Sequence, residues 1–152
     1  MIKNNHIIIK NRLTMTEEEL LHWNKNWKNF RPYEIDSRDF SIKKYIPSLD
    51  GIQNMREEYK KPLKINSAWR TPNHNKAVGG KKNSDHTWIE GRDINSSAFD
   101  VHINSIQEGR ELEELAIKHG FNAIGRYRRS MFIHISMRTP KLCGKIYQWG
   151  YW

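Results

Sequence analysis

The sequence predicts an α+β fold in which a small central antiparallel sheet is flanked by helices. Apolar residues recur at helical spacing in three segments, which are residues 17–27, 48–61 and 103–119. Two short segments with strand-like alternation, 123–127 and 131–137, are separated by a basic turn and predict a hairpin. With 152 residues, six Trp, six Tyr and five Phe, we expect one domain over residues 1–152 with a substantial core.

Each predicted helix has a start or stop signal in the sequence. Thr16 precedes three glutamates in a capping-box pattern, which begins the first helix at the next residue. Pro62 ends the second helix, and Gly120 is a suitable C-terminal cap for the third. A further short helix is expected over residues 72–78, because Pro72 suits the first helical position.

Further strands are expected at residues 6–10, 63–68 and 91–95, and residues 30–47 read as an irregular connection. In the second hairpin strand, alternation puts His134 on the face opposite the aliphatic residues, where it can meet a cleft. The tail, residues 141–152, is rich in aromatic residues. We expect it to fold back on the core, and a carbohydrate- or wall-binding platform is the alternative.

The net charge of +9 implies an anionic partner, for which nucleic acid, anionic lipid and an acidic wall polymer all qualify. The cations are scattered among acidic residues without a nucleic-acid motif, so we expect no nucleic-acid partner. A single cysteine, Cys143, excludes a disulfide framework and a cysteine zinc site. Neither a membrane span nor a signal peptide is apparent, which predicts synthesis in the cytoplasm.

The stretch from residue 65 to residue 94 is mostly polar loop, and long ordered loops in compact domains are usually functional. His86 lies in this loop, and Asp93 heads the strand that follows it. Catalytic zinc needs three protein ligands and one open position. We therefore hypothesise a zinc site made by His86, Asp93 and His134. A hydrogen-bonded core histidine is the other interpretation of His134.

Several spaced motifs resemble the M15 zinc peptidases. The motifs are Ser67-Ala68-Trp69-Arg70-Thr71-Pro72, His74-Asn75, Val78-Gly79-Gly80, Asn83-Ser84-x-His86-x6-Asp93-Ile94, Gly120-Phe121, Gly125-Arg126-Tyr127 and Phe132-Ile133-His134-Ile135. The resemblance covers about residues 15–149 and is nearest to the D-Ala-D-Ala carboxypeptidase branch, whose relatives include phage endolysins. It implies the fold shared by these DD-peptidases and the hedgehog signalling domain.

The resemblance also implies roles for individual residues. His86, Asp93 and His134 are the implied ligands of Zn2+. Arg70 is the implied catalytic residue that binds the substrate's terminal carboxylate, which suits a planar guanidinium. Ser84 is an implied hydrogen-bond partner of the substrate. The structural alternatives are an exposed ion pair for Arg70 and a turn residue for Ser84.

Three positions depart from the family pattern: Ile89 replaces a glycine, Ser136 replaces an aspartate after the last histidine, and Met131 replaces the acidic residue of several branches. Methionine cannot transfer a proton, so the general base is not assigned. Its candidates on chemical grounds are Asp85, Glu90 and His102. Arg126 or Arg128 could stabilise a developing oxyanion.

The resemblance implies a zinc metallopeptidase that hydrolyses amide bonds in peptidoglycan stem peptides, as a carboxypeptidase or an endopeptidase. The motifs do not choose the bond, the host or the oligomeric state. We expect action on the cell wall after release, or as part of a virion. The alternative is an inactive or weakly active zinc-binding module of the same fold, such as a phage structural or wall-binding protein.

Overall fold

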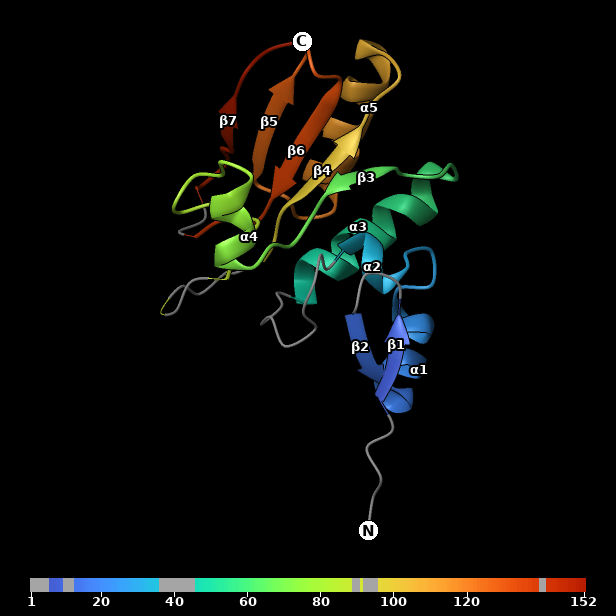
Figure 1. Ribbon diagram of the computed structural model, residues 1–152. Helices are drawn as coiled ribbons and strands as arrows, with labels where there is room; N and C mark the ends of the chain where they lie inside the picture. The colour runs from blue at the N-terminus through green and yellow to red at the C-terminus, as the bar shows by residue number, and fades with distance from the viewer. Residues whose placement is uncertain (1–5, 10–12, 36–45, 89–90, 92–95, 140–141) are drawn as a thin grey trace.

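A computed structural model of the chain describes residues 6–9, 13–35, 46–88, 91, 96–139 and 142–152. Its main sheet has five strands in the order β3-β4-β6-β5-β7 (Figure 1). These strands are β3 (Ile65–Ser67), β4 (Phe99–His102), β5 (Ala123–Tyr127), β6 (Phe132–Ser136) and β7 (Tyr147–Trp149). A separate hairpin pairs β1 (His6–Ile9) with β2 (Leu13–Thr16).

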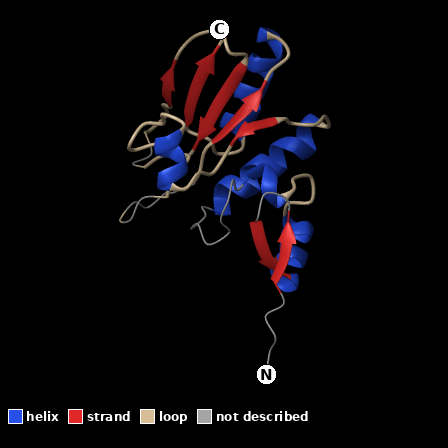
Figure 2. Cartoon of the chain, viewed as in Figure 1, coloured by secondary structure: helices blue, strands red, loops and turns tan. Residues whose placement is uncertain are grey.

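Five helices accompany the sheets in the described part of the chain (Figure 2). They are α1 (Glu17–Asn26), α2 (Pro32–Ile35), α3 (Ile46–Tyr59), α4 (Pro72–Ala77) and α5 (Ile106–Lys118). The predicted α+β class, with a small central sheet flanked by helices, is confirmed. None of the described helices combines the length and the apolar character needed to cross a bilayer.

The sheet is mixed, which differs from the antiparallel sheet that we predicted. β3, β4, β6 and β5 pair antiparallel in succession, but β7 pairs parallel to β5. The difference arises because β7 comes from the C-terminal tail, which returns to the outer edge of β5. The expectation that this tail folds back on the core is therefore met by a strand.

Local signals account for the starts of α1, α4 and α5. The side chain of Thr16 accepts a hydrogen bond from the backbone N of Glu19 at 3.1 Å, as a capping box requires. The side chain of Thr71 caps α4 in the same way, accepting from the N of His74 at 3.0 Å. α5 begins later than predicted because Ser105 is its cap.

Four regions differ from the sequence expectations or were not reached by them. The predicted irregular connection 30–47 contains α2, and its residues 36–45 lie outside the described part of the chain. Of the predicted strand 91–95, residues 92–95 also lie outside it, and Gly91 is in a turn. β2 and β4 were not predicted.

The core lies where α3 and α5 pack against each other and α5 packs on the sheet (Figure 1). Its fully buried side chains include Leu49, Ile52, Met55, Phe99, Val101, Leu112, Phe121, Ile133 and Ile135. Gly51 on α3 allows a close approach, since a Cβ there would lie 2.9 Å from the ring of Phe121. This packing explains a glycine that would otherwise only weaken the helix.

One cross-strand row of residues runs over all five strands of the main sheet. Asp100 is paired with Ser67 on one side and His134 on the other. Gly125 is paired with His134 and with Trp149. Residues paired across strands project from the same face of a sheet. The row therefore puts a carboxylate, an imidazole and an indole side by side, with a glycine between the two rings.

Gly125 leaves room for the indole of Trp149, and this predicts a specific packing defect. In the variant Gly125→Ala, the new Cβ would lie 2.5 Å from Nε1 and Cε2 of Trp149. We expect overpacking to lower the free energy of unfolding by about 1–3 kcal/mol, measured by denaturant titration. The added change Trp149→Ala should remove most of this penalty. Equal penalties in both backgrounds would show that the indole does not set the requirement for glycine.

Candidate metal centre

The centre of the site is the contact between Asp100 and His134 on neighbouring strands. Because the two residues are paired across β4 and β6, their side chains project from the same face. Nδ1 of His134 lies 2.9 Å from Oδ1 of Asp100. Both residues are buried, so neither group exchanges its partner freely for water.

The loop that follows α4 brings His86 to the same point. The N of Arg70 donates to the O of His86 at 2.7 Å, and Arg70 forms a parallel bridge with Thr87. Nδ1 of His86 lies 2.5 Å from the O of Ala68, which orients the ring. Its other nitrogen, Nε2, then lies 3.3 Å from Oδ1 of Asp100.

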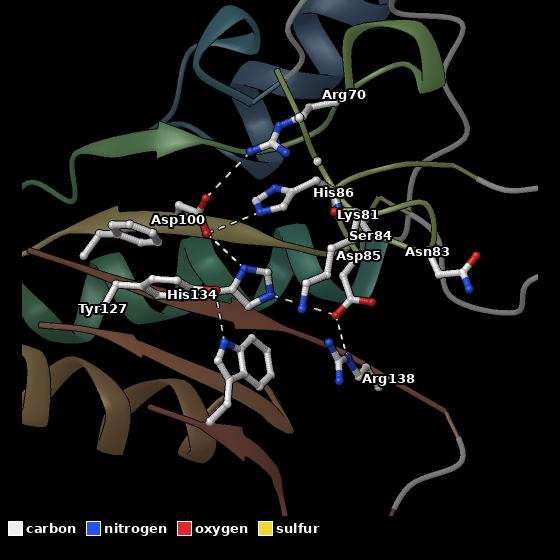
Figure 3. Close-up of a pocket in the computed structure, with 14 residues that line it drawn as sticks. Arg70, Lys81, Asn83, Ser84, Asp85, His86, Asp100, Tyr127, His134 and Arg138 are labelled. Atoms are coloured by element: carbon white, nitrogen blue, oxygen red, sulfur yellow. Dashed lines mark hydrogen bonds and ion pairs between the residues drawn. The ribbon is translucent and has the colours of Figure 1, made fainter. Parts of the chain in front are cut away.

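His86, Asp100 and His134 each offer one ligand atom, and these atoms lie within 4.8 Å of one another. Figure 3 shows the two imidazoles directed toward the Asp100 carboxylate. Zinc binds N and O ligands at about 2.0–2.2 Å in a tetrahedron, which separates two ligand atoms by roughly 3.4 Å. The observed separations of 2.9 and 3.3 Å need little adjustment. The residues present fit a divalent ion.

The carboxylate in this cluster is Asp100, a residue that the sequence hypothesis did not include. Asp93, the carboxylate of that hypothesis, lies outside the described residues. A signal for Asp100 was present in the sequence, because it stands between Phe99 and Val101 in an apolar strand. A carboxylate in such a strand needs a positive partner or a metal to offset its burial.

Ion pairing sets the protonation of the cluster. Burial by itself raises the pKa of Asp100, but hydrogen bonds from His134 and His86 outweigh burial and hold that pKa well below its usual range. Burial by itself lowers the pKa of His134, whereas its hydrogen bonds with Asp100 and Asp85 raise it above the usual value. Without a metal, the protein therefore favours a protonated His134 beside two carboxylates.

The cluster lies in a pocket of about 550 Å³. The pocket is lined by Arg70, Gly79, Gly80, Lys81, Asn83, Ser84, Asp85, His86, Asp100, Tyr127, Phe132, His134, Arg138 and Trp149. Cations and aromatic rings thus surround the candidate ligands, a setting that suits a ligand with both a negative group and an apolar part.

Arg70 is directed into this pocket above Asp100 (Figure 3). Its Nη2 donates to Oγ of Ser67 at 2.8 Å, and its Nη1 donates to Oδ1 of Asn75 at 3.1 Å. Its Nη2 also lies 3.9 Å from Oδ2 of Asp100. The guanidinium is therefore held in place mainly by neutral partners, and the interpretation of an exposed ion pair does not apply.

Ser84 also lines the pocket, and its Oγ accepts a hydrogen bond from the N of His86 at 3.2 Å. This contact belongs to the turn that carries the histidine, as the structural alternative expected. Because Ser84 is at the pocket wall as well, the turn contact and a contact with a substrate are compatible.

The candidate general bases have different positions. Asp85 lines the pocket, but its Oδ2 accepts from Oγ of Ser136 at 2.6 Å and from Nε of Arg138 at 2.7 Å. His102 ends β4 and is not among the pocket-lining residues, and Glu90 lies outside the described part of the chain. Met131 is partly buried against the core.

The arginines expected near an oxyanion lie elsewhere. Arg126 forms an ion pair with Glu113 on α5 and donates to the O of Gly150 at 3.3 Å. Arg126 and Arg128 both line a second pocket beside the turn between β5 and β6. The cations that the structure places at the candidate centre are Arg70, Lys81 and Arg138.

Comparison with family models assigns most of the chain to a known family. A family model described as Peptidase M15 matches residues 14–136, which include all three residues of the His86, Asp100 and His134 cluster. The tail with β7 lies beyond the matched range. No curated protein matches the chain.

The electrostatic coupling predicts a pKa change in the metal-free protein. In the variant Asp100→Asn, the charge that favours a protonated His134 is removed while the burial stays. We expect the pKa of His134 to fall, as followed by NMR titration of the ring protons in the presence of a chelator. The matched variant Asp50→Asn changes an exposed carboxylate that accepts a hydrogen bond from Trp27. It should leave the pKa of His134 unaltered. An unchanged His134 pKa in Asp100→Asn would contradict the coupling.

Proposed function

The chain belongs to the M15 peptidases, a family of metallopeptidases, and from this premise we propose that it is a zinc-dependent hydrolase of amide bonds in peptidoglycan stem peptides. The observation that carries the proposal is the convergence of two imidazoles and a carboxylate in a pocket within the matched residues. We propose His86, Asp100 and His134 as the ligands. Asp100 replaces Asp93 in this proposal because it already contacts both histidines.

The donor set suits zinc chemistry. When bound, zinc supplies a Lewis acid and lowers the pKa of water, so that a nucleophile forms near neutral pH. Hydrogen bonds of the second ring nitrogens orient both imidazoles: Nδ1 of His86 contacts the O of Ala68, and Nε2 of His134 contacts Oγ of Ser136. Pre-oriented ligands reduce the reorganisation that binding and reaction require.

Arg70 is the residue that we propose binds the substrate's carboxylate. A guanidinium matches a carboxylate with two parallel hydrogen bonds, and Ser67 and Asn75 hold it at the rim of the pocket. Fixing that end of a peptide would bring the adjacent amide toward the three candidate ligands. Ser84, at the same wall, is proposed as a further hydrogen-bond partner of the peptide.

Two features favour a cell-wall substrate over an ordinary peptide. The resemblance is nearest to the D-Ala-D-Ala carboxypeptidase branch, whose substrates end in a carboxylate. The net charge of +9 favours residence on an anionic wall polymer. We propose action at the wall after release from the cell or from within a virion.

A second candidate function is a zinc-binding module without turnover. It is favoured by Met131 at the position of the usual acid and by Asp85, whose Oδ2 is engaged by Ser136 and Arg138. Zinc-loaded protein incubated with purified peptidoglycan separates the two functions. Release of soluble muropeptides or of the terminal amino acid, abolished by a chelator, supports hydrolysis, whereas stoichiometric zinc without either product supports the module.

The proposed ligand set makes a direct prediction about metal content. His86→Ala, His134→Ala and Asp100→Asn should each lose stoichiometric zinc, measured by mass spectrometry of metals after dialysis. Their affinity loss should exceed the roughly 10–100-fold that outer-shell partners cost. Asp93→Asn is the matched control and should bind zinc as the unmodified protein does. Zinc loss in Asp93→Asn and in both histidine variants, with normal binding in Asp100→Asn, would instead restore the ligand set of the sequence hypothesis.

The role of Arg70 predicts a defect in substrate use without loss of metal. Arg70→Lys keeps the charge but not the two parallel hydrogen bonds. We expect kcat/KM on a stem peptide to fall about 10- to 100-fold, because a hydrogen bond to a charged group contributes about 1.5–3 kcal/mol. Arg110→Lys, on an exposed face of α5, is the control. Unchanged kcat/KM in Arg70→Lys would exclude the carboxylate-binding role.

A further inference from the structure

Five side chains form a closed ring of contacts that includes the imidazole of His134. Nε2 of His134 lies 3.2 Å from Oγ of Ser136, which donates to Oδ2 of Asp85 at 2.6 Å. Nε of Arg138 donates to the same Oδ2 at 2.7 Å. The guanidinium of Arg138 lies 4.9 Å from the ring centre of Trp149, whose ring centre is 5.2 Å from that of His134.

The direction of the hydrogen bonds follows from the donor inventory. An ionised carboxylate only accepts, so the hydroxyl proton of Ser136 points to Asp85. The Ser136 oxygen is then free to accept the Nε2 proton of His134. With a single proton on Nε2, the neutral ring has a free lone pair on Nδ1, which is the atom that faces Asp100.

We infer that Asp85 is a positioning residue for His134, acting through Ser136 to hold the tautomer and ring orientation in which Nδ1 can bind the metal. The inference rests on the proposed metal centre. Ligating histidines generally donate their other N–H to a carboxylate, carbonyl or water, and such partners tune the site. Here a serine relays the interaction, because the carboxylate lies 3.9 Å from Nε2.

The backbone of Asp85 strengthens this assignment. Its O accepts from the N of Ser97 at 3.0 Å and from the N of Ala98 at 3.3 Å, on the segment that leads into β4. Asp85 also directly precedes His86. One residue therefore contacts the segments that carry all three proposed ligands: the His86 turn, the strand of Asp100 and, through Ser136, the strand of His134.

The assignment gives Asp85 a role other than general base. Its Oδ2 is occupied by two donors, and it lies at the Nε2 edge of His134, whereas Nδ1 is the atom that would hold the proposed metal. Its side chain is 4% exposed, so the carboxylate is held by these partners and not by water. Arg138 and Trp149 complete the ring and limit the movement of both groups.

The test measures zinc affinity by chelator competition in Asp85→Ala, Ser136→Ala and the double variant. We expect each single change to weaken binding by about 10- to 100-fold, as for other outer-shell partners. If Asp85 acts through Ser136, the double variant should bind zinc about as weakly as the weaker-binding single variant. Its affinity loss should not equal the product of the two single losses. Independent, multiplying losses would overturn the relay.

A swap keeps the test informative if the alanine variants fold poorly. Asp85→Ser combined with Ser136→Asp moves the carboxylate next to Nε2 and should recover most of the affinity that Asp85→Ala loses. Asp50→Ala, an exposed carboxylate bonded to Trp27, is the control and should bind zinc normally. Thermal unfolding of each metal-free variant reports its folding separately.

The outcomes separate this inference from the proposal beneath it. An unmodified protein that binds no zinc would overturn both the metal centre and the role of Asp85. An unmodified protein that binds zinc, with Asp85→Ala binding equally well, would overturn the positioning role alone. A well-folded Asp85→Ala variant that binds zinc weakly, together with a well-folded swap variant that recovers none of the affinity, would also contradict the positioning role.

Discussion

The register between β4 and β6 is the constraint on which the candidate centre depends. It pairs Asp100 with His134, and a shift of one residue would send one of the two side chains to the opposite face. The aliphatic residues on either side of His134, Ile133 and Ile135, are fully buried in the core. Burial of these neighbours therefore enforces the pairing on the other face, so that the same strand builds the core and the site.

The histidine from the loop depends on backbone hydrogen bonds more than on packing. Between α4 and β4 the chain has few apolar side chains, yet His86 is only 4% exposed. Its turn is tied to the end of β3 by Arg70 and to the start of β4 by Ser97 and Ala98. Backbone hydrogen bonds to neighbouring segments therefore hold the His86 turn in place, although its polar sequence offers little apolar packing.

Charge balance explains why this polar cluster can be buried. Two carboxylates, Asp85 and Asp100, lie on either side of His134 with low exposure. Burial by itself raises the pKa of Asp85, but hydrogen bonds from His134, Ser136 and Arg138 hold it well below its usual range. Arg138 and a protonated His134 offset the two negative charges in the metal-free protein, and a divalent ion would replace the proton.

The sequence alone determined the features that depend on neighbours along the chain. The capping of α1 and α4, the hairpin of β5 and β6, and the position of His134 on the face opposite the core follow from spacing and turn residues within a few positions. Tertiary structure decided which carboxylate meets the two histidines and where the tail goes. Asp100 contacts His134 through a strand pairing across 34 positions and meets His86 from the loop, and β7 adds Trp149 to the pocket by pairing with β5. Periodicity carries no information on such pairings, because strand partners distant in sequence are chosen by the burial of the whole sheet.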